Sequence, residues 1–97
     1  MALHLRNVHP GEVLQHEFLA PAGISVRQLA RMTGMPVCVL ESLIDGKMPV
    51  NVDTAIALGA ALGMRARFWL GLQIDFDLEE AQREVRAAGV EVVMNEQ

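Results

Sequence analysis

Three side chains near the N-terminus are of the types that bind transition metals. His9, Glu12 and His16 supply two imidazoles and a carboxylate, and Glu12 and His16 lie one helical turn apart. Their spacing matches no established metal motif, and Pro10 directly after His9 is typical of the first position of a helix. We therefore interpret this group as a helix start with an exposed histidine, and we expect no metal and no cofactor.

The only thiol in the sequence is Cys38, which stands at the start of a predicted helix. A redox-sensitive thiolate is one interpretation of it, and a small side chain near a groove is the simpler one, which we favour. Glycine-rich phosphate loops, nucleophile elbows and CxxC pairs are all missing from the sequence. The sequence therefore predicts a protein that is not an enzyme.

The charges are distributed unevenly along the 97 residues, whose formal net charge is −4. Residues 1–74 carry six basic and five acidic side chains, whereas residues 75–97 carry two basic and seven acidic ones. This balance argues against a polybasic binder but leaves room for contact with a polyanion if the acidic part points elsewhere. The longest uncharged stretch, residues 54–64, is shorter than the roughly 20 residues of a membrane span. We expect a cytoplasmic protein without membrane contact.

Glycine and proline divide the chain into segments whose apolar residues recur at helical spacing, which predicts an all-α fold of five helices. The expected helix starts are Pro10, Ser25 with Gln28 as a capping box, Pro36, Asn51 and a position near Arg65. Gly34, Gly46 and Gly63 are expected to end the second, third and fourth helices. The expected buried faces are Val13, Leu14 and Phe18; Val26, Leu29, Ala30 and Thr33; Val37, Leu40, Leu43 and Ile44; and Ala55, Ile56, Gly59 and Leu62.

The second and third predicted helices have the pattern of a helix-turn-helix unit. Ala30 is small enough to let the helices approach, and Gly34 permits the tight turn. Leu40 and Leu43 face the core and fix the third helix across the first two. This arrangement presents a helix that a major groove could receive.

Four stretches of the sequence carry a specific family resemblance: HPGEVLQHEFLAPAGIS, QLARMTGMP, DGKMPVNVDTAIALGAALG and RFWLGLQIDFDL. The chain resembles the HigA/VapI antitoxin branch of the Xre-type, lambda-repressor-like helix-turn-helix regulators over residues 9–78. The resemblance implies a bacterial homodimer that binds an RNase toxin of the HigB type and represses its own toxin–antitoxin operon at a palindromic operator. We expect one domain over residues 1–97, with the helix-turn-helix part at 9–78 and an acidic C-terminal tail at 79–97. Residues 90–94 form a short β-prone patch that could pair with a dimer partner or fray.

The resemblance also assigns residues to the two sides of a DNA interface. The reading helix is residues 36–45, and the side chains expected to face base edges are Pro36, Val37, Cys38 and Ser42. Those expected to hold phosphates are Arg27, Gln28, Arg31 and Lys47. Related reading helices commonly carry polar donors where this one has Pro36, Val37, Cys38 and Val39, and Glu41 and Asp45 add negative charge.

The fifth predicted helix is apolar around nearly its whole circumference, so one face can pack within the domain and another requires a second chain. The expected dimer interface is Trp69, Leu72, Ile74, Phe76 and Leu78. The leading hypothesis is a dimeric DNA-binding antitoxin and autorepressor. The alternative is a protein-interaction module that neutralises a toxin or only dimerises, and that has lost specific DNA recognition.

Overall fold

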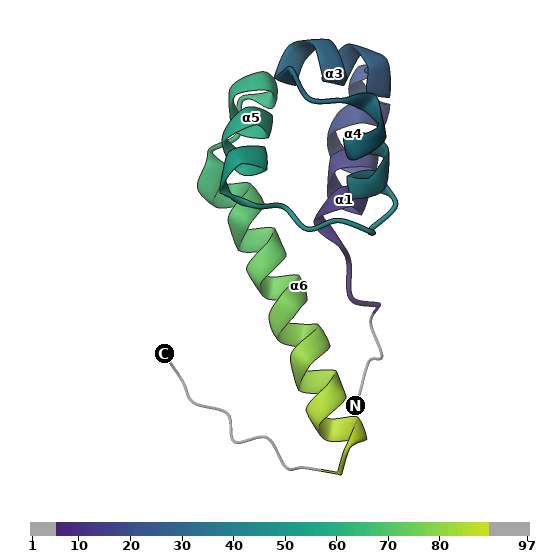
Figure 1. Ribbon diagram of the computed structural model, residues 1–97, viewed down its shortest axis with the longest axis vertical. Helices are drawn as coiled ribbons and strands as arrows, with labels where there is room; N and C mark the ends of the chain where they lie inside the picture. Colours follow the sequence, from purple (N-terminus) through teal and green to yellow (C-terminus); the bar gives the residue numbers. More distant parts are fainter. Residues whose placement is uncertain (1–5, 90–97) are drawn as a thin grey trace.

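The computed structural model describes residues 6–89, which form a helical body from which one long helix extends (Figure 1). α1, η1 and α2 follow one another without a break, so the described residues form five helices and no strand, as the sequence predicted. The elements are α1 (Pro10–Val13), the π-helical segment η1 (Leu14–Leu19), α2 (Ala20–Ala22), α3 (Val26–Thr33), α4 (Val37–Ile44), α5 (Val52–Leu62) and α6 (Ala66–Ala87). The predicted patch at 90–94 lies outside the described residues.

Local capping signals place the helix ends where the sequence predicted them. Ser25 Oγ accepts the N–H of Gln28 at 3.1 Å, and the side-chain oxygen of Gln28 accepts the N–H of Ser25 at 2.8 Å. This reciprocal pair is the capping box that starts α3. Asn51 caps α5 through its side chain. Gly34 and Gly63 end α3 and α5 with φ of 76° and 83°, in the left-handed region that favours glycine.

The first helix contains a π-helical segment that the sequence pattern did not predict. The N–H of Ala20, directly after η1, bonds to the carbonyl of Gln15, five residues earlier. This wider turn brings Leu14 and Leu19, also five residues apart, into the core together. Val13, expected in the buried stripe, is only half-buried, because Pro10, Gly11 and Leu14 form the inward face here.

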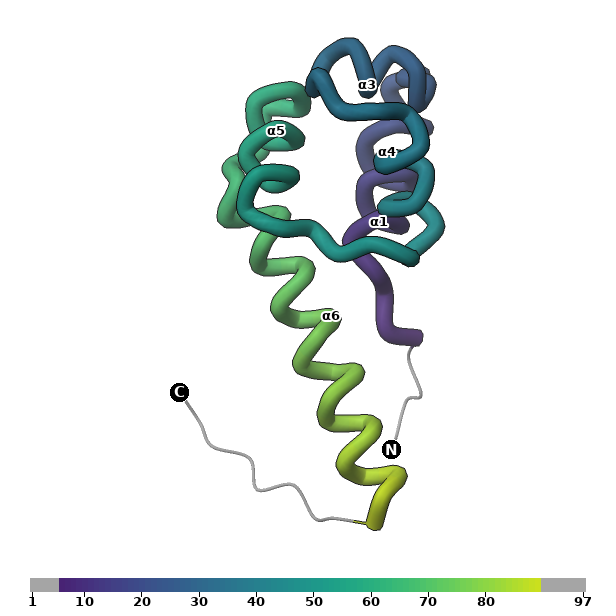
Figure 2. Tube along the Cα trace, viewed as in Figure 1, coloured from purple at the N-terminus to yellow at the C-terminus, as the bar shows by residue number. Residues whose placement is uncertain are grey.

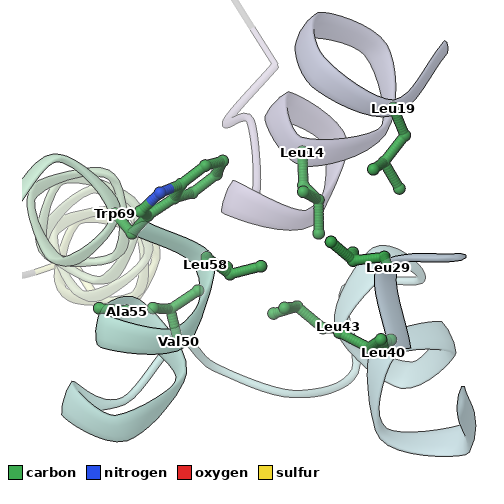
Figure 3. Packing of buried hydrophobic residues seen from close by; sticks show 9 residues of the cluster. All are labelled: Leu14, Leu19, Leu29, Leu40, Leu43, Val50, Ala55, Leu58 and Trp69. Carbon is green, nitrogen blue, oxygen red and sulfur yellow. The ribbon is translucent and has the colours of Figure 1, made fainter. Parts of the chain in front are cut away.

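The core joins all five helices through nine buried hydrophobic residues (Figure 3): Leu14, Leu19, Leu29, Leu40, Leu43, Val50, Ala55, Leu58 and Trp69. On α5 the prediction of Ile56 as a core residue is wrong, because its side chain is 55% exposed. Successive residues of an α-helix are about 100° apart around its axis. Ala55 and Leu58 point inward, and Ile56 therefore faces solvent.

His9 joins the start of α1 to two distant parts of the chain. Its Nδ1 accepts the N–H of Gly11 at 2.9 Å and so caps the helix. The imidazole packs edge-on against Phe76 of α6, with ring centroids 4.8 Å apart. It also lies beside Met48 in the loop between α4 and α5, whose backbone favours the charged imidazole. The interpretation of His9 as a helix-start residue is confirmed.

The free energy of unfolding should fall as His9 becomes protonated. Burial lowers the pKa of His9 below its ordinary value, although Glu12, Asp77 and the Met48 backbone favour the charged form. The unfolded chain therefore takes up this proton first, at a pKa near 6.5. The contribution of His9 to the free energy of unfolding is fully present above that pH. It is lost as the pH drops through the lowered pKa of the folded state. Thermal melting between about pH 7.5 and 5.5 measures this loss.

The matched control is His9→Asn, because asparagine caps helices without titrating in this range. We expect the melting temperature of this variant to depend less on pH than that of the unsubstituted chain. Equal pH dependence in the two proteins would show that His9 does not couple folding to protonation.

Polar side chains hold α6 against the body along one side. The N–H of Val50, in the loop before α5, donates to the buried Oε1 of Gln73 at 2.7 Å. Asn7 donates to the backbone oxygen of Phe76 at 2.9 Å and reaches Glu80 at 3.0 Å. The helix continues without a break past Leu78 to Ala87, so the first residues of the acidic tail are helical.

Candidate nucleic-acid interface

The turn between α3 and α4 brings two helices together at one end of the molecule (Figure 2). Thr33 fixes this turn, because its hydroxyl donates to the carbonyl of Leu29 at 2.8 Å and accepts the N–H of Met35 at 3.2 Å. Pro36 is the cap residue before α4 rather than its first residue. Leu40 and Leu43 are fully buried, so the opposite face of α4 is free to contact a ligand.

Four donor side chains lie on the neighbouring α3 and in the turn after α4. Arg27, Arg31 and Lys47 are exposed, and Arg27 and Arg31 lie one turn apart on α3. Within residues 6–89 no carboxylate pairs with these three cations. Gln28 is also exposed, and because its oxygen completes the capping box, its amide N–H groups are the part that can donate to phosphate. The geometry therefore offers these residues to a polyanion.

The four predicted reading residues occupy the outward side of α4 and its first turn. Pro36 and Cys38 are exposed, and Val37 and Ser42 are half-buried. Among these, only the Ser42 hydroxyl and the Cys38 thiol can donate a hydrogen bond from a side chain. The structure thus brings the predicted reading residues together, and the face they form is largely apolar.

The acidic residues divide into two groups. Glu41 on α4 and Asp45 directly after it are exposed, and they reduce attraction to phosphate. The acidic residues of α6 lie on a helix that runs away from α3 to the opposite end of the molecule (Figure 1). The larger negative charge is therefore kept away from α3 and α4.

Two of the five residues predicted for a dimer interface are available on the surface. Ile74 and Leu78 are 57% and 55% exposed. Trp69 is 0% exposed and packs against Phe18 with ring centroids 5.0 Å apart, so its assignment to an interface is wrong.

Leu72 and Phe76 also lie on the inward side of α6. Leu72 packs against the core, and the ring of Phe76 covers His9. Both are half-buried within the chain itself, and their assignment to a dimer interface stays a prediction.

The outward side of α6 has a regular pattern, of which the sequence interpretation named only Ile74 and Leu78. Its members alternate at spacings of three and four residues, the heptad spacing of paired helices. The α6 stripe consists of Gly71, Ile74, Leu78, Ala81 and Val85. The spacing was available in the sequence, but the strong signal of the aromatic residues on the inward side obscured it.

The described residues contain no group of three histidine, cysteine, aspartate or glutamate side chains placed to hold a metal ion. Nδ1 of His9, one of the candidate ligands, is already occupied by its bond to the helix backbone. In residues 6–89 no helix combines the length and apolarity needed to cross a membrane.

Comparison with known proteins adds relatives of similar length and fold, although no family model matches the chain. Antitoxin HigA-1 of Vibrio cholerae is 41% identical over 73 residues, which cover 75% of this chain and 69% of that protein. The structure of Pseudomonas aeruginosa antitoxin HigA with the higBA promoter has a TM-score of 0.81 and 29% identity, covering 92% of this chain and all of the other. The antitoxin GraA in complex with its operator has a TM-score of 0.78 and 30% identity, covering 98% of this chain and 99% of the other.

Proposed function

The chain belongs to the HigA antitoxin family of helix-turn-helix regulators, and from this premise we propose that it binds operator DNA and represses its own toxin–antitoxin operon. It is a DNA-binding transcriptional regulator and an antitoxin. The observation that carries this function is the free face of α4, flanked by the unpaired cations Arg27, Arg31 and Lys47. Two similar structures, at 29% and 30% identity, are of antitoxins with promoter or operator DNA.

In the proposed complex, α4 lies in the major groove and α3 crosses the backbone above it. The side chains that contact phosphates are Arg27, Gln28, Arg31 and Lys47. Those that face base edges are Pro36, Val37, Cys38 and Ser42. These roles are supported by the exposure of the four phosphate-contacting residues and of Pro36 and Cys38.

We propose that the active form is a homodimer joined through the α6 stripe. A palindromic operator presents two half-sites related by a two-fold axis, which a two-fold dimer matches. The exposed side chains of Ile74, Leu78 and Val85 support this interface, because they lie on one side of a helix whose other side is already packed. The heptad spacing of the α6 stripe fits a second α6 helix.

The toxin partner is proposed to be an RNase of the HigB type, on the strength of family membership. Because the protein acts on operator DNA, we place it in the cytoplasm of a bacterium.

We treat residues 1–97 as one domain, with the helix-turn-helix part at 9–78 and the acidic residues from 79 onward as its C-terminal extension.

Removing one phosphate contact should weaken operator binding without changing the preference for the operator. Arg31→Ala removes two cations from a dimer, and we expect the affinity to fall about tenfold and the salt dependence to decrease by about two counterions. Fluorescence anisotropy on DNA from upstream of the gene, across a salt series and beside scrambled DNA, measures both quantities.

The matched control is Arg86→Ala, which removes the same charge from the far end of α6, where Arg86 lies near Glu79. We expect its operator affinity to stay within about twofold of that of the unsubstituted protein. If the unsubstituted protein binds operator and scrambled DNA equally, the repressor function fails. The alternative, a protein-interaction module without specific DNA recognition, is then preferred.

A further inference from the structure

The start of α4 presents an apolar ridge on the side that faces DNA in the proposed function. Pro36 and Cys38 are exposed. Val37 is half-buried and does not belong to the hydrophobic residues that pack against the core. Val37, expected in the buried face of this helix, is therefore outside the core cluster, and each of the three residues leaves part of its apolar surface exposed.

The polar groups beside this ridge limit which bases it can distinguish. Guanine presents two acceptors, N7 and O6, in the major groove, and it is read by the paired donors of arginine or lysine. No arginine, lysine, asparagine or glutamine lies on α4. Glu41 and Asp45, when ionised, only accept hydrogen bonds, and Ser42 offers a single hydroxyl of little selectivity.

Thymine is the one base whose major-groove edge carries an apolar group, the 5-methyl. Cysteine behaves as a small, polarisable hydrophobe, and valine presents two methyl groups, so both are suited to contact it. Resting on the proposed function, we infer that the operator is read through the 5-methyl groups of thymines that contact Val37 and Cys38. These two residues then determine specificity, whereas the cations of α3 determine affinity.

Deoxyuridine tests this inference, because it lacks only the methyl group of thymine and keeps every hydrogen-bonding atom. The duplex is the region upstream of the gene, prepared once with thymine and once with deoxyuridine throughout, beside a scrambled duplex prepared in the same two forms. One buried methyl group contributes about fourfold in affinity. With at least one methyl in each half-site, we expect the deoxyuridine operator to bind at least about 15-fold more weakly.

The salt dependence should be the same for both operators, because the phosphate contacts are unchanged. Scrambled DNA should bind equally in its two forms. Cys38→Ser replaces the sulfur with a hydroxyl at an exposed position, and it should reduce the thymine-to-deoxyuridine ratio. Cys38→Ala keeps an apolar contact and should retain more of that ratio than Cys38→Ser.

Two results would overturn the inference, and they are distinguishable. If both operator forms bind equally and still more tightly than scrambled DNA, the protein represses by reading DNA shape rather than methyl groups. If neither form binds more tightly than scrambled DNA, the proposed function fails and the inference fails with it.

Discussion

Leu78→Glu is expected to convert the dimer to a monomer and to lower operator affinity about 100-fold or more. Leu78 lies at the centre of the α6 stripe and is 55% exposed in the single chain. In a two-fold interface each substitution occurs twice, so two carboxylates enter the same apolar contact. Each half-site is then bound independently, and the gain from linking two reading helices is lost.

Sedimentation equilibrium gives the oligomeric state of this variant, and anisotropy on the operator gives its affinity. The fold of the single chain should survive, because Leu78 is not part of the buried core. The helical circular dichroism signal of the monomer should therefore stay near that of the unsubstituted protein.

A matched control is Ala87→Glu, which adds the same charge to an exposed position at the end of α6. Ala87 lies on the opposite side of the helix from the α6 stripe, so this variant should remain dimeric. If Leu78→Glu also remains dimeric at the concentrations used for DNA binding, the two copies meet through another surface.

The sequence predicted the helix-turn-helix well because its signals act over a few residues. The capping box of Ser25 and Gln28 closes within one turn, and Gly34 ends α3 through its own backbone angle. Each of these interactions forms between chain neighbours, so residue type and spacing determine it. The assignment of reading residues on α4 came instead from the family resemblance, and it stays a prediction.

The sequence did not predict which side of a helix faces the core where that orientation depends on residues distant in the chain. A helix that is apolar around nearly its whole circumference, as α6 is between residues 68 and 78, has no strongly preferred inward face in its own sequence. Contacts with Phe18 and His9 decide that Trp69 and Phe76 point inward and that Ile74 points outward.

Gly11 is another residue whose importance only the tertiary structure reveals. In the sequence it looks like part of a helix start after Pro10. In the structure it is buried where α1 crosses the end of α4. A Cβ built on Gly11 would overlap the carbonyl oxygen of Leu43, and it would lie 2.8 Å from the carbonyl carbon of Leu43 and 2.9 Å from Cα of Ile44.

We expect Gly11→Ala to lower the free energy of unfolding by about 3 kcal/mol. All three overlapping atoms belong to the backbone of α4, so no side-chain rotation relieves the overlap and the two helices must separate. Such a loss corresponds to a fall of about 12 °C or more in melting temperature for a domain of this size. Thermal unfolding followed by circular dichroism measures it.

Gly71→Ala is the matched control, because the same change is made inside a helix where a Cβ meets no atom within 4 Å. Both substitutions are best compared in the Leu78→Glu background, where dimer formation does not contribute to stability. There Gly71→Ala should stabilise the protein by about 0.5–1 kcal/mol through reduced backbone entropy of the unfolded chain. If Gly11→Ala melted within about 2 °C of its parent, α1 and α4 would not be in the close contact that positions the reading helix.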